Sequence, residues 1–141
     1  MADKNEIFYG TPAAFNAVLS AWAVTVPEEQ VETVMSVLAM QFLERLTMKT
    51  PVAAKDGGRA RGNWTVTLGR PSSDYDDAIR DGTGGATIAK GQTTIDDAPP
   101  YGWIWILNNV PYIERLENGW SQQAPTGMLD NTLNELGVQF T

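Results

Sequence analysis

The stretch YGWIWILNNVPYIERLENGWSQQAPTGM, residues 101–128, is the densest apolar and aromatic part of the chain and holds three of its five tryptophans. Tryptophan and isoleucine alternate from residue 103 to 106, so a strand here is apolar on both faces and should be covered on both. We predict this strand from about residue 101 to 108, where Asn-Asn and then Pro111 supply turn chemistry. Such a strand with a polar, aromatic corner after it is either the centre of a small sheet or a contact between subunits.

Length and composition predict a single domain spanning residues 1–141. The chain has 43% hydrophobic and 19% charged residues, which are globular values. Its apolar runs are shorter than the roughly 20 residues that a membrane span needs, and residues 1–10 lack the features of a signal peptide. We therefore expect the chain to fold in cytoplasm without a membrane partner.

The chain contains no cysteine and no histidine. Disulfides, thiolate catalysis and Cys-based metal sites are therefore excluded, and the commonest general base is missing. Asp74, Asp76 and Asp77 could hold a divalent cation, but the EF-hand spacing fails at Ile79 and Gly85. The glycines from residue 82 to 91 match neither a Walker nor a dinucleotide motif. These patterns favour a protein that is not an enzyme and needs no cofactor or metal.

The net charge of −7 indicates that the whole chain is repelled by DNA. One local exception is a short basic cluster, and we interpret it as the soluble side chains of a loop: Lys55, Arg59, Arg61 and Arg70. The aromatic residues after position 100 lack basic residues between them, so we assign them to the core and to a protein interface rather than to base stacking.

The first half of the chain predicts two helices, the second one long. Residues 11–22 carry apolar side chains at helical spacing behind Thr11 as N-cap. A second helix is predicted from Pro27 to Met48, with Thr25 and Glu28 at capping-box spacing and Thr50-Pro51 ending it. Its predicted core stripe, widened by Val37 and Met40, is Val31, Val34, Met35, Leu38, Phe42 and Leu46.

The second half predicts a small, mostly antiparallel sheet and a C-terminal helix, so the fold class is α+β. Residues 64–68 alternate apolar and polar side chains like a half-buried strand. Loops near 52–62 and 72–100 are expected to be mobile; the second holds at most a short helix at 76–80 and a few helical or extended residues at 86–90. The last helix is predicted to begin after Thr126 as cap, with an apolar edge of Met128, Leu129, Leu133 and Leu136.

Two motifs together resemble one protein family. GRARGNW at residues 58–64 follows the long helix, and NNVPYIERLENGWSQQAPTGM at residues 108–128 leads into the last helix. They are similar to TPVDTGRxRGxW and TNNLPYxxxLEYGWSxQAPxGM in the neck and tail-completion proteins of long-tailed bacteriophages, the lambda tail-completion protein Z group. The chain differs by a first motif three residues longer, TPVAAKDGGR, and by Glu-Asn-Gly at residues 117–119 in place of Glu-Tyr-Gly.

The resemblance implies a structural virion protein that assembles in the host cytoplasm at the head–tail junction. Copies are expected to form a homomeric, hexameric ring that contacts head-closure or connector proteins and tail-terminator or tail-tube proteins, and through which DNA passes without being bound specifically. The expected contact residues on one side are Arg59, Arg61 and Trp64. The other side of the contact, or the corner that shapes it, is expected to comprise Tyr112, Glu114, Arg115, Glu117, Trp120 and Gln123.

Three alternatives stay open from the sequence. The chain could be the tail-terminator ring of the same particle, whose α+β architecture is similar. It could be an adaptor that is monomeric until it meets a template. The third alternative is a carboxylate-metal hydrolase that uses Asp74, Asp76 and Asp77.

Overall fold

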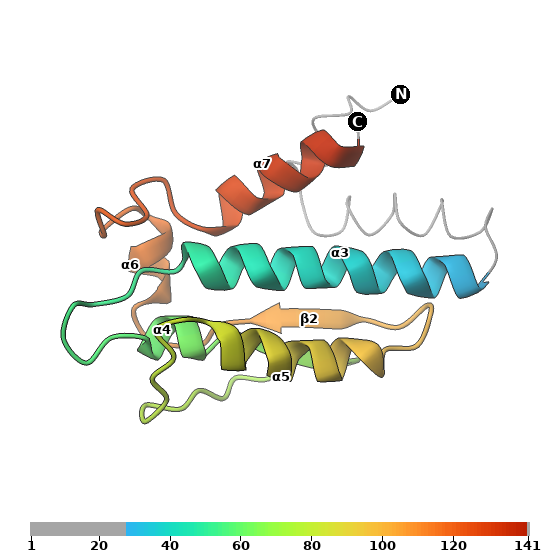
Figure 1. Cartoon of the computed structure of the whole chain (residues 1–141), viewed down its shortest axis with the longest axis horizontal. Coiled ribbons are helices and arrows are strands. Elements are labelled where there is room, and N and C mark those ends of the chain that lie inside the picture. Colours follow the sequence, from blue (N-terminus) through green and yellow to red (C-terminus); the bar gives the residue numbers. More distant parts are fainter. Residues whose placement is uncertain (1–27, 141) are drawn as a thin grey trace.

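The computed structural model describes residues 28–140 and shows an α+β fold in which one long helix, α3 (Glu28–Lys49), runs through the middle (Figure 1). Helix α7 (Leu129–Phe140) lies on one side of α3, and α5 (Gly85–Asp96) with the strands lies on the other. The short helix α6 (Ile113–Glu117) sits at one end. The predicted helix at residues 11–22 with its cap Thr11, and the predicted cap Thr25 of the long helix, lie outside the described residues.

The sheet consists, within the described residues, of two antiparallel strands, β1 (Thr65–Leu68) and β2 (Ile104–Leu107). Val66 pairs with Ile106 and Leu68 with Ile104, so these four side chains share one face of the sheet. That face packs on the core cluster formed by Ala39, Leu43, Val66 and Ile95. The two predicted strands and their antiparallel arrangement are thus confirmed.

The other face of β2 is partly exposed, which contradicts the prediction that both faces of this strand are covered. Trp103 is 55% exposed and stacks on Trp105, with ring centroids 5.9 Å apart. The Trp105 indole donates a hydrogen bond to the carbonyl of Gly69 at 3.1 Å. Stacking and this bond give the outer tryptophans partners without placing them in the core.

Helix α3 follows its predicted bounds within a residue, and Val31, Leu38 and Leu46 of the predicted stripe are buried. Leu43 is fully buried, although it is not part of that stripe. Val37, expected to widen the stripe, is instead 53% exposed. The predicted stripe covers only part of the buried surface of α3 because α5 and α7 approach the helix from different sides, which a single periodic stripe cannot represent.

Helix α5 corrects the prediction for residues 72–100. Twelve residues, 85–96, form one helix where only a few helical or extended residues were expected around 86–90. Gly91 makes this possible, since a Cβ there would lie 2.2 Å from the side chain of Leu43, so glycine lets the two helices touch. Ile95 is fully buried beside it.

The start of α5 is held by Asp81. Its carboxylate accepts hydrogen bonds from the backbone N–H groups of Gly84 and Thr87 and from the Thr87 hydroxyl, at 2.6–3.0 Å. Burial alone would raise the pKa of Asp81, but the bonds from Thr87, Gly84 and Thr83 outweigh it and hold the pKa below its ordinary value. Asp81 is therefore a helix cap and is not free to bind a ligand.

Residues 76–80 form a turn rather than the predicted short helix. The side chain of Asn63 explains the difference: its amide donates to the carbonyl of Asp76 at 2.9 Å and its oxygen accepts the Asp76 N–H at 2.7 Å. These bonds hold the backbone of Asp76 against Asn63, and the Ala78 N–H is bound by the Asp76 side chain at 2.8 Å. Similarly, the end of the loop at 52–62 is a helical turn, α4 (Arg59–Gly62). The mobility expected for both loops stays a prediction.

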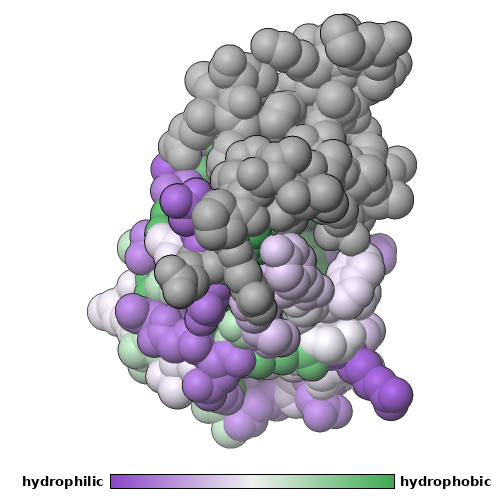
Figure 2. Space-filling model, turned by 90° about the vertical axis from the view of Figure 1, so that its right-hand side faces the viewer, coloured by the Kyte–Doolittle hydropathy of each residue, from purple (hydrophilic) through white to green (hydrophobic). Residues whose placement is uncertain are grey.

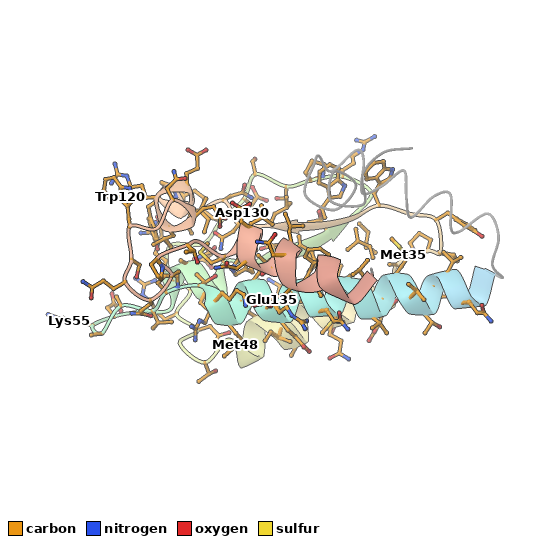
Figure 3. All side chains as sticks on the ribbon, turned by 90° about the horizontal axis from the view of Figure 1, so that it is seen from above. Met35, Met48, Lys55, Trp120, Asp130 and Glu135 are labelled. Atoms are coloured by element: carbon orange, nitrogen blue, oxygen red, sulfur yellow. The ribbon has the colours of Figure 1, made fainter. Side chains whose placement is uncertain are left out.

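No helix among residues 28–140 is long and apolar enough to cross a membrane. Figure 2 looks onto the end of the molecule opposite α6, where hydrophilic and hydrophobic side chains intermingle over the described part of the surface. Trp120, at 73% the most exposed of the large apolar side chains among the described residues, lies at the other end (Figure 3).

Candidate functional site

The segment at residues 108–128, here called the corner, links β2 to α7 through α6 and two tight glycine turns. Gly119 has φ +85°, and a Cβ there would lie 2.3 Å from the carbonyl oxygen of Pro125. Gly127 has φ +82°, and its Cβ would lie 2.3 Å from the carbonyl oxygen of Glu117. Both positions therefore require glycine, and the chain folds back on itself closely.

The first residues of the corner bind it to distant loops. Asn108 donates its side-chain amide to the carbonyl of Ala60 at 2.8 Å. Asn109 donates to the carbonyls of Ser72 and Asp74 at 2.8 and 3.1 Å. The two asparagines thus do more than end the strand, because they join it to segments more than thirty residues away.

Glu117 holds the end of the corner. Its carboxylate accepts the backbone N–H groups of Met128, Leu129 and Asp130, at 2.9–3.2 Å, and so caps the start of α7. This corrects the prediction that Thr126 is the cap, because its hydroxyl instead accepts a bond from the Asn131 side chain. A carboxylate at the positive end of a helix dipole is favourable, so Glu117 stabilises α7 from outside it.

The apolar edge of α7 also differs from the prediction. Met128 and Leu136 are buried as expected, at 1% and 2% exposure, whereas Leu129 is 43% exposed. Thr132, which was not predicted, is completely buried and donates its hydroxyl to the Met128 carbonyl at 2.8 Å. Met128 and Ala124 pack on Leu46 of α3, which fixes the corner against the long helix.

Gln123 attaches the corner to the loop after α3. Its side-chain oxygen accepts the N–H of Val52 at 2.9 Å, and its amide donates to the Val52 carbonyl at 2.8 Å. The sequence carries no local signal for this pair, since the two residues are 71 positions apart.

Arg61 and Trp64 are likewise used within the subunit. The Arg61 guanidinium donates to the carbonyls of Met48, Thr50 and Gly82, at 2.7–3.1 Å, and so satisfies the end of α3. The Trp64 indole donates to the Thr50 hydroxyl at 2.7 Å, and its ring packs against both core clusters. The structure therefore assigns these two predicted contact residues a structural role inside the chain.

Arg59 joins the loop region to α6. It forms an ion pair with Asp77, and its guanidinium carbon lies 5.3 Å from the centre of the Tyr112 ring. Its Nε is buried without an acceptor. Arg59 and Tyr112 were predicted on opposite sides of a contact between subunits. The structure brings them together within one subunit.

Three of the predicted contact residues point outward. Trp120 is 73% exposed, and Arg115 lies over its ring, with the guanidinium carbon 5.0 Å from the ring centre. Glu114 is exposed on the same short helix. We call Glu114, Arg115 and Trp120 the outer knob; Figure 3 shows Trp120 near the end of the molecule that also carries Lys55.

The acidic residues proposed for the alternative hydrolase do not assemble into a metal site. Within the part of the chain that the structure describes, no three carboxylates come together as metal ligands. Asp77 pairs with Arg59, and Asp76 accepts the backbone N–H of Ala78 at 2.8 Å. These carboxylates are engaged in local turns of an exposed loop.

The corner is a rigid scaffold that holds an exposed surface in place. Polar side chains of the corner bind backbone groups, two glycines allow its sharp turns, and one tryptophan with its arginine is left outside. No family model, no curated protein and no solved structure matches this chain.

Proposed function

We propose that this protein is a structural component of the head–tail junction of a long-tailed bacteriophage. Its copies form a hexameric, homomeric ring that joins the tail to the head and leaves a channel for DNA. The neighbours of the ring are head-closure or connector proteins on one side and tail-terminator or tail-tube proteins on the other. The resemblance of residues 58–64 and 108–128 to the neck and tail-completion proteins suggests this place.

One observation carries the proposal: the outer knob is exposed although the corner beneath it is firmly held. An isolated tryptophan that is 73% exposed buries little apolar surface within its own chain. Tryptophan and arginine are the residues that most often dominate protein–protein binding energy. Because the corner fixes the position of Trp120 before binding, little conformational entropy is lost on contact.

The charge of the chain supports the proposed channel. A net charge of −7 disfavours tight binding to phosphates, so DNA can slide past without being retained. Arg61, one of the few basic residues of the local cluster, already has three carbonyl acceptors within the subunit. An assembled ring with Lys55, Arg59 and Arg61 lining the channel would contradict this part of the proposal.

The test is to inactivate the gene in the phage that encodes the chain and to image the products. We expect filled heads and tails of normal length that do not join, with the wild-type gene restoring joined particles. Tails of uncontrolled length would instead identify a tail terminator, whose task is to stop tube growth. Joined, infectious particles without this polypeptide would refute a role at the junction.

The outer knob is tested in the same system by supplying Trp120→Ala in place of the wild-type chain. The matched control is Tyr101→Ala, which removes another aromatic side chain that is 61% exposed but lies outside the corner. Loss of joined particles with the first variant alone supports the knob as the contact. Equal yields from both variants would show that the ring uses another surface.

A further inference from the structure

A hollow of about 410 Å³ lies between residues 51–58 and helix α6. Its wall includes Lys55, Arg59 and Arg80, and the side chains of Tyr112 and Leu116 line it from α6. Figure 3 places Lys55 at the same end of the molecule as Trp120, on the loop that forms the rim. We call this hollow the basic pocket.

The wall of the basic pocket is fixed by bonds on three sides. Gln123 binds both backbone groups of Val52, and Arg80 forms an ion pair with Asp56 at 3.2 Å. The carbonyl of Gly58 accepts the Asp81 N–H at 3.1 Å. Gly58 has φ +100°, and a Cβ there would lie 2.7 Å from the backbone of Asp81, so the two segments touch. The pocket therefore exists without a ligand to shape it.

The pocket is basic although the protein is acidic. Three cationic side chains line it and one carboxylate, that of Asp56, does so. Arg80 uses its donors on Asp56 and on the carbonyls of Asp77 and Ile79. Arg80 is thus paired with Asp56 as Arg59 is with Asp77, and Lys55 carries the positive charge that has no carboxylate partner within the described residues.

Lys55 and Arg59 both have donors that the subunit leaves unused. Lys55 is exposed and takes part in no ion pair within the described residues. Arg59 binds Asp77 through one terminal nitrogen, while its Nε is buried without an acceptor. A buried donor without an acceptor is destabilising, so an arrangement that gives this Nε an acceptor is favoured.

We infer that the basic pocket binds a carboxylate-bearing segment of a partner polypeptide, with an acidic side chain next to an apolar one. A guanidinium and an ammonium group match carboxylate oxygens, and Arg59 has the forked geometry for it. Tyr112 and Leu116 offer apolar surface for the neighbouring side chain. A polypeptide is favoured over nucleic acid because one carboxylate can lie between the flanking carboxylates of Asp56 and Asp77, whereas the closely spaced phosphates of a duplex would be repelled by both and by the acidic chain as a whole.

This inference concerns the pocket alone and does not require the ring proposed above. The probe is a synthetic, capped hexapeptide of alternating glutamate and leucine, titrated into the full chain by calorimetry. The same peptide with glutamine in place of glutamate, and a short double-stranded DNA, are titrated in parallel. We expect the acidic peptide to bind with a Kd below about 1 mM and the glutamine peptide to bind at least about tenfold more weakly.

Three variants locate the binding. Lys55→Glu reverses an exposed charge at the pocket rim and should weaken binding of the acidic peptide by about tenfold. Lys90→Glu makes the same change at an exposed lysine of α5, outside the pocket, and should alter the Kd less than about twofold. Arg59→Lys, which keeps the charge but loses the fork, should weaken binding while the near-UV circular dichroism stays unchanged.

The remaining outcomes overturn the inference. Equal losses with Lys55→Glu and Lys90→Glu would mean general charge attraction without a site. Equal affinity for the glutamine peptide, or no binding of the acidic one at millimolar concentration, would exclude a carboxylate pocket. Tighter binding of the DNA, lost with Lys55→Glu, would reassign the pocket to phosphate.

Discussion

The core beneath α3 and the corner at residues 108–128 are stabilised in different ways. In the core, Leu43, Ile95 and Val66 are buried among apolar neighbours, and the helices approach closely at Gly91. The corner buries only a few side chains, such as Ala124 and Met128. Its path is fixed instead by directional hydrogen bonds that the side chains of Glu117 and Gln123 accept from backbone N–H groups. Apolar burial stabilises the whole domain, whereas the directional bonds set the shape of one surface.

The largest effect is expected in the core. Leu43→Ala removes a fully buried side chain and should lower the free energy of unfolding by about 2–5 kcal/mol, measured by urea denaturation. Val37→Ala on the same helix is the control, because its side chain is 53% exposed and should change stability by less than about 0.5 kcal/mol. Similar losses from both variants would show that α3 has no preferred buried face.

The next effect concerns binding rather than stability. Trp120→Ala should leave the free energy of unfolding within about 0.5 kcal/mol of wild type, because the side chain is 73% exposed. If the outer knob is a contact, the same change should weaken association by at least about 2 kcal/mol, measured on the assembled ring or the joined particle. A large loss of stability would instead place Trp120 among the structural residues of the corner.

Removing the cap should loosen one end of α7. Glu117→Ala should cost about 0.5–2 kcal/mol and should speed hydrogen exchange at Met128, Leu129 and Asp130, whose N–H groups lose their acceptor. Glu114→Ala, on the same short helix and without that role, is the control. Unchanged exchange in Glu117→Ala would mean that α7 begins independently of the corner.

The smallest effect is expected at Glu135, between α7 and α3. The hydrogen bond from Lys49, together with the charges of Lys49 and Arg45, holds the pKa of Glu135 below its ordinary value of 4.5 despite partial burial. A depressed pKa stabilises the folded state above the unfolded pKa, and this contribution is lost as the pH falls through the folded one.

Accordingly, wild type should exceed Glu135→Gln in stability by at most about 1 kcal/mol at pH 7, since the pair is exposed, and the difference should shrink below pH 4.5. Urea denaturation at several pH values measures it. A difference that grows as the pH falls would contradict the assigned sign.

Helix α5 shows where sequence periodicity stops being informative. Its sequence, GATIAKGQTTID, contains two glycines and three threonines, which are weak helix formers, so the pattern predicts a loop. Packing overrides that preference, because Gly91 touches Leu43 and Ile95 is fully buried. Asp81 also caps the helix start, and an aspartate shortly before the helix was the one local signal that could have indicated it.

The predicted contact residues divide in a similar way. Residue types indicated the corner as a contact region, which stays a prediction, and they could not separate Trp120, which is exposed, from Trp64, which is half-buried and bonded to Thr50. Glu117 and Gln123 are residue types that usually lie on the surface. Here Glu117 binds the Asp130 N–H, 13 positions away, and Gln123 binds Val52, 71 positions away.

The sequence by itself determined the α+β class, the long helix α3, both strands and the position of α7, because apolar spacing and turn residues act over a few neighbouring positions. Only the tertiary structure decided which polar groups form hydrogen bonds within the subunit and which remain exposed on its surface. A hydrogen bond such as that between Gln123 and Val52 joins residues 71 positions apart, so no local pattern encodes it. The exposed surface of the corner consists of the side chains that take no part in those long-range bonds.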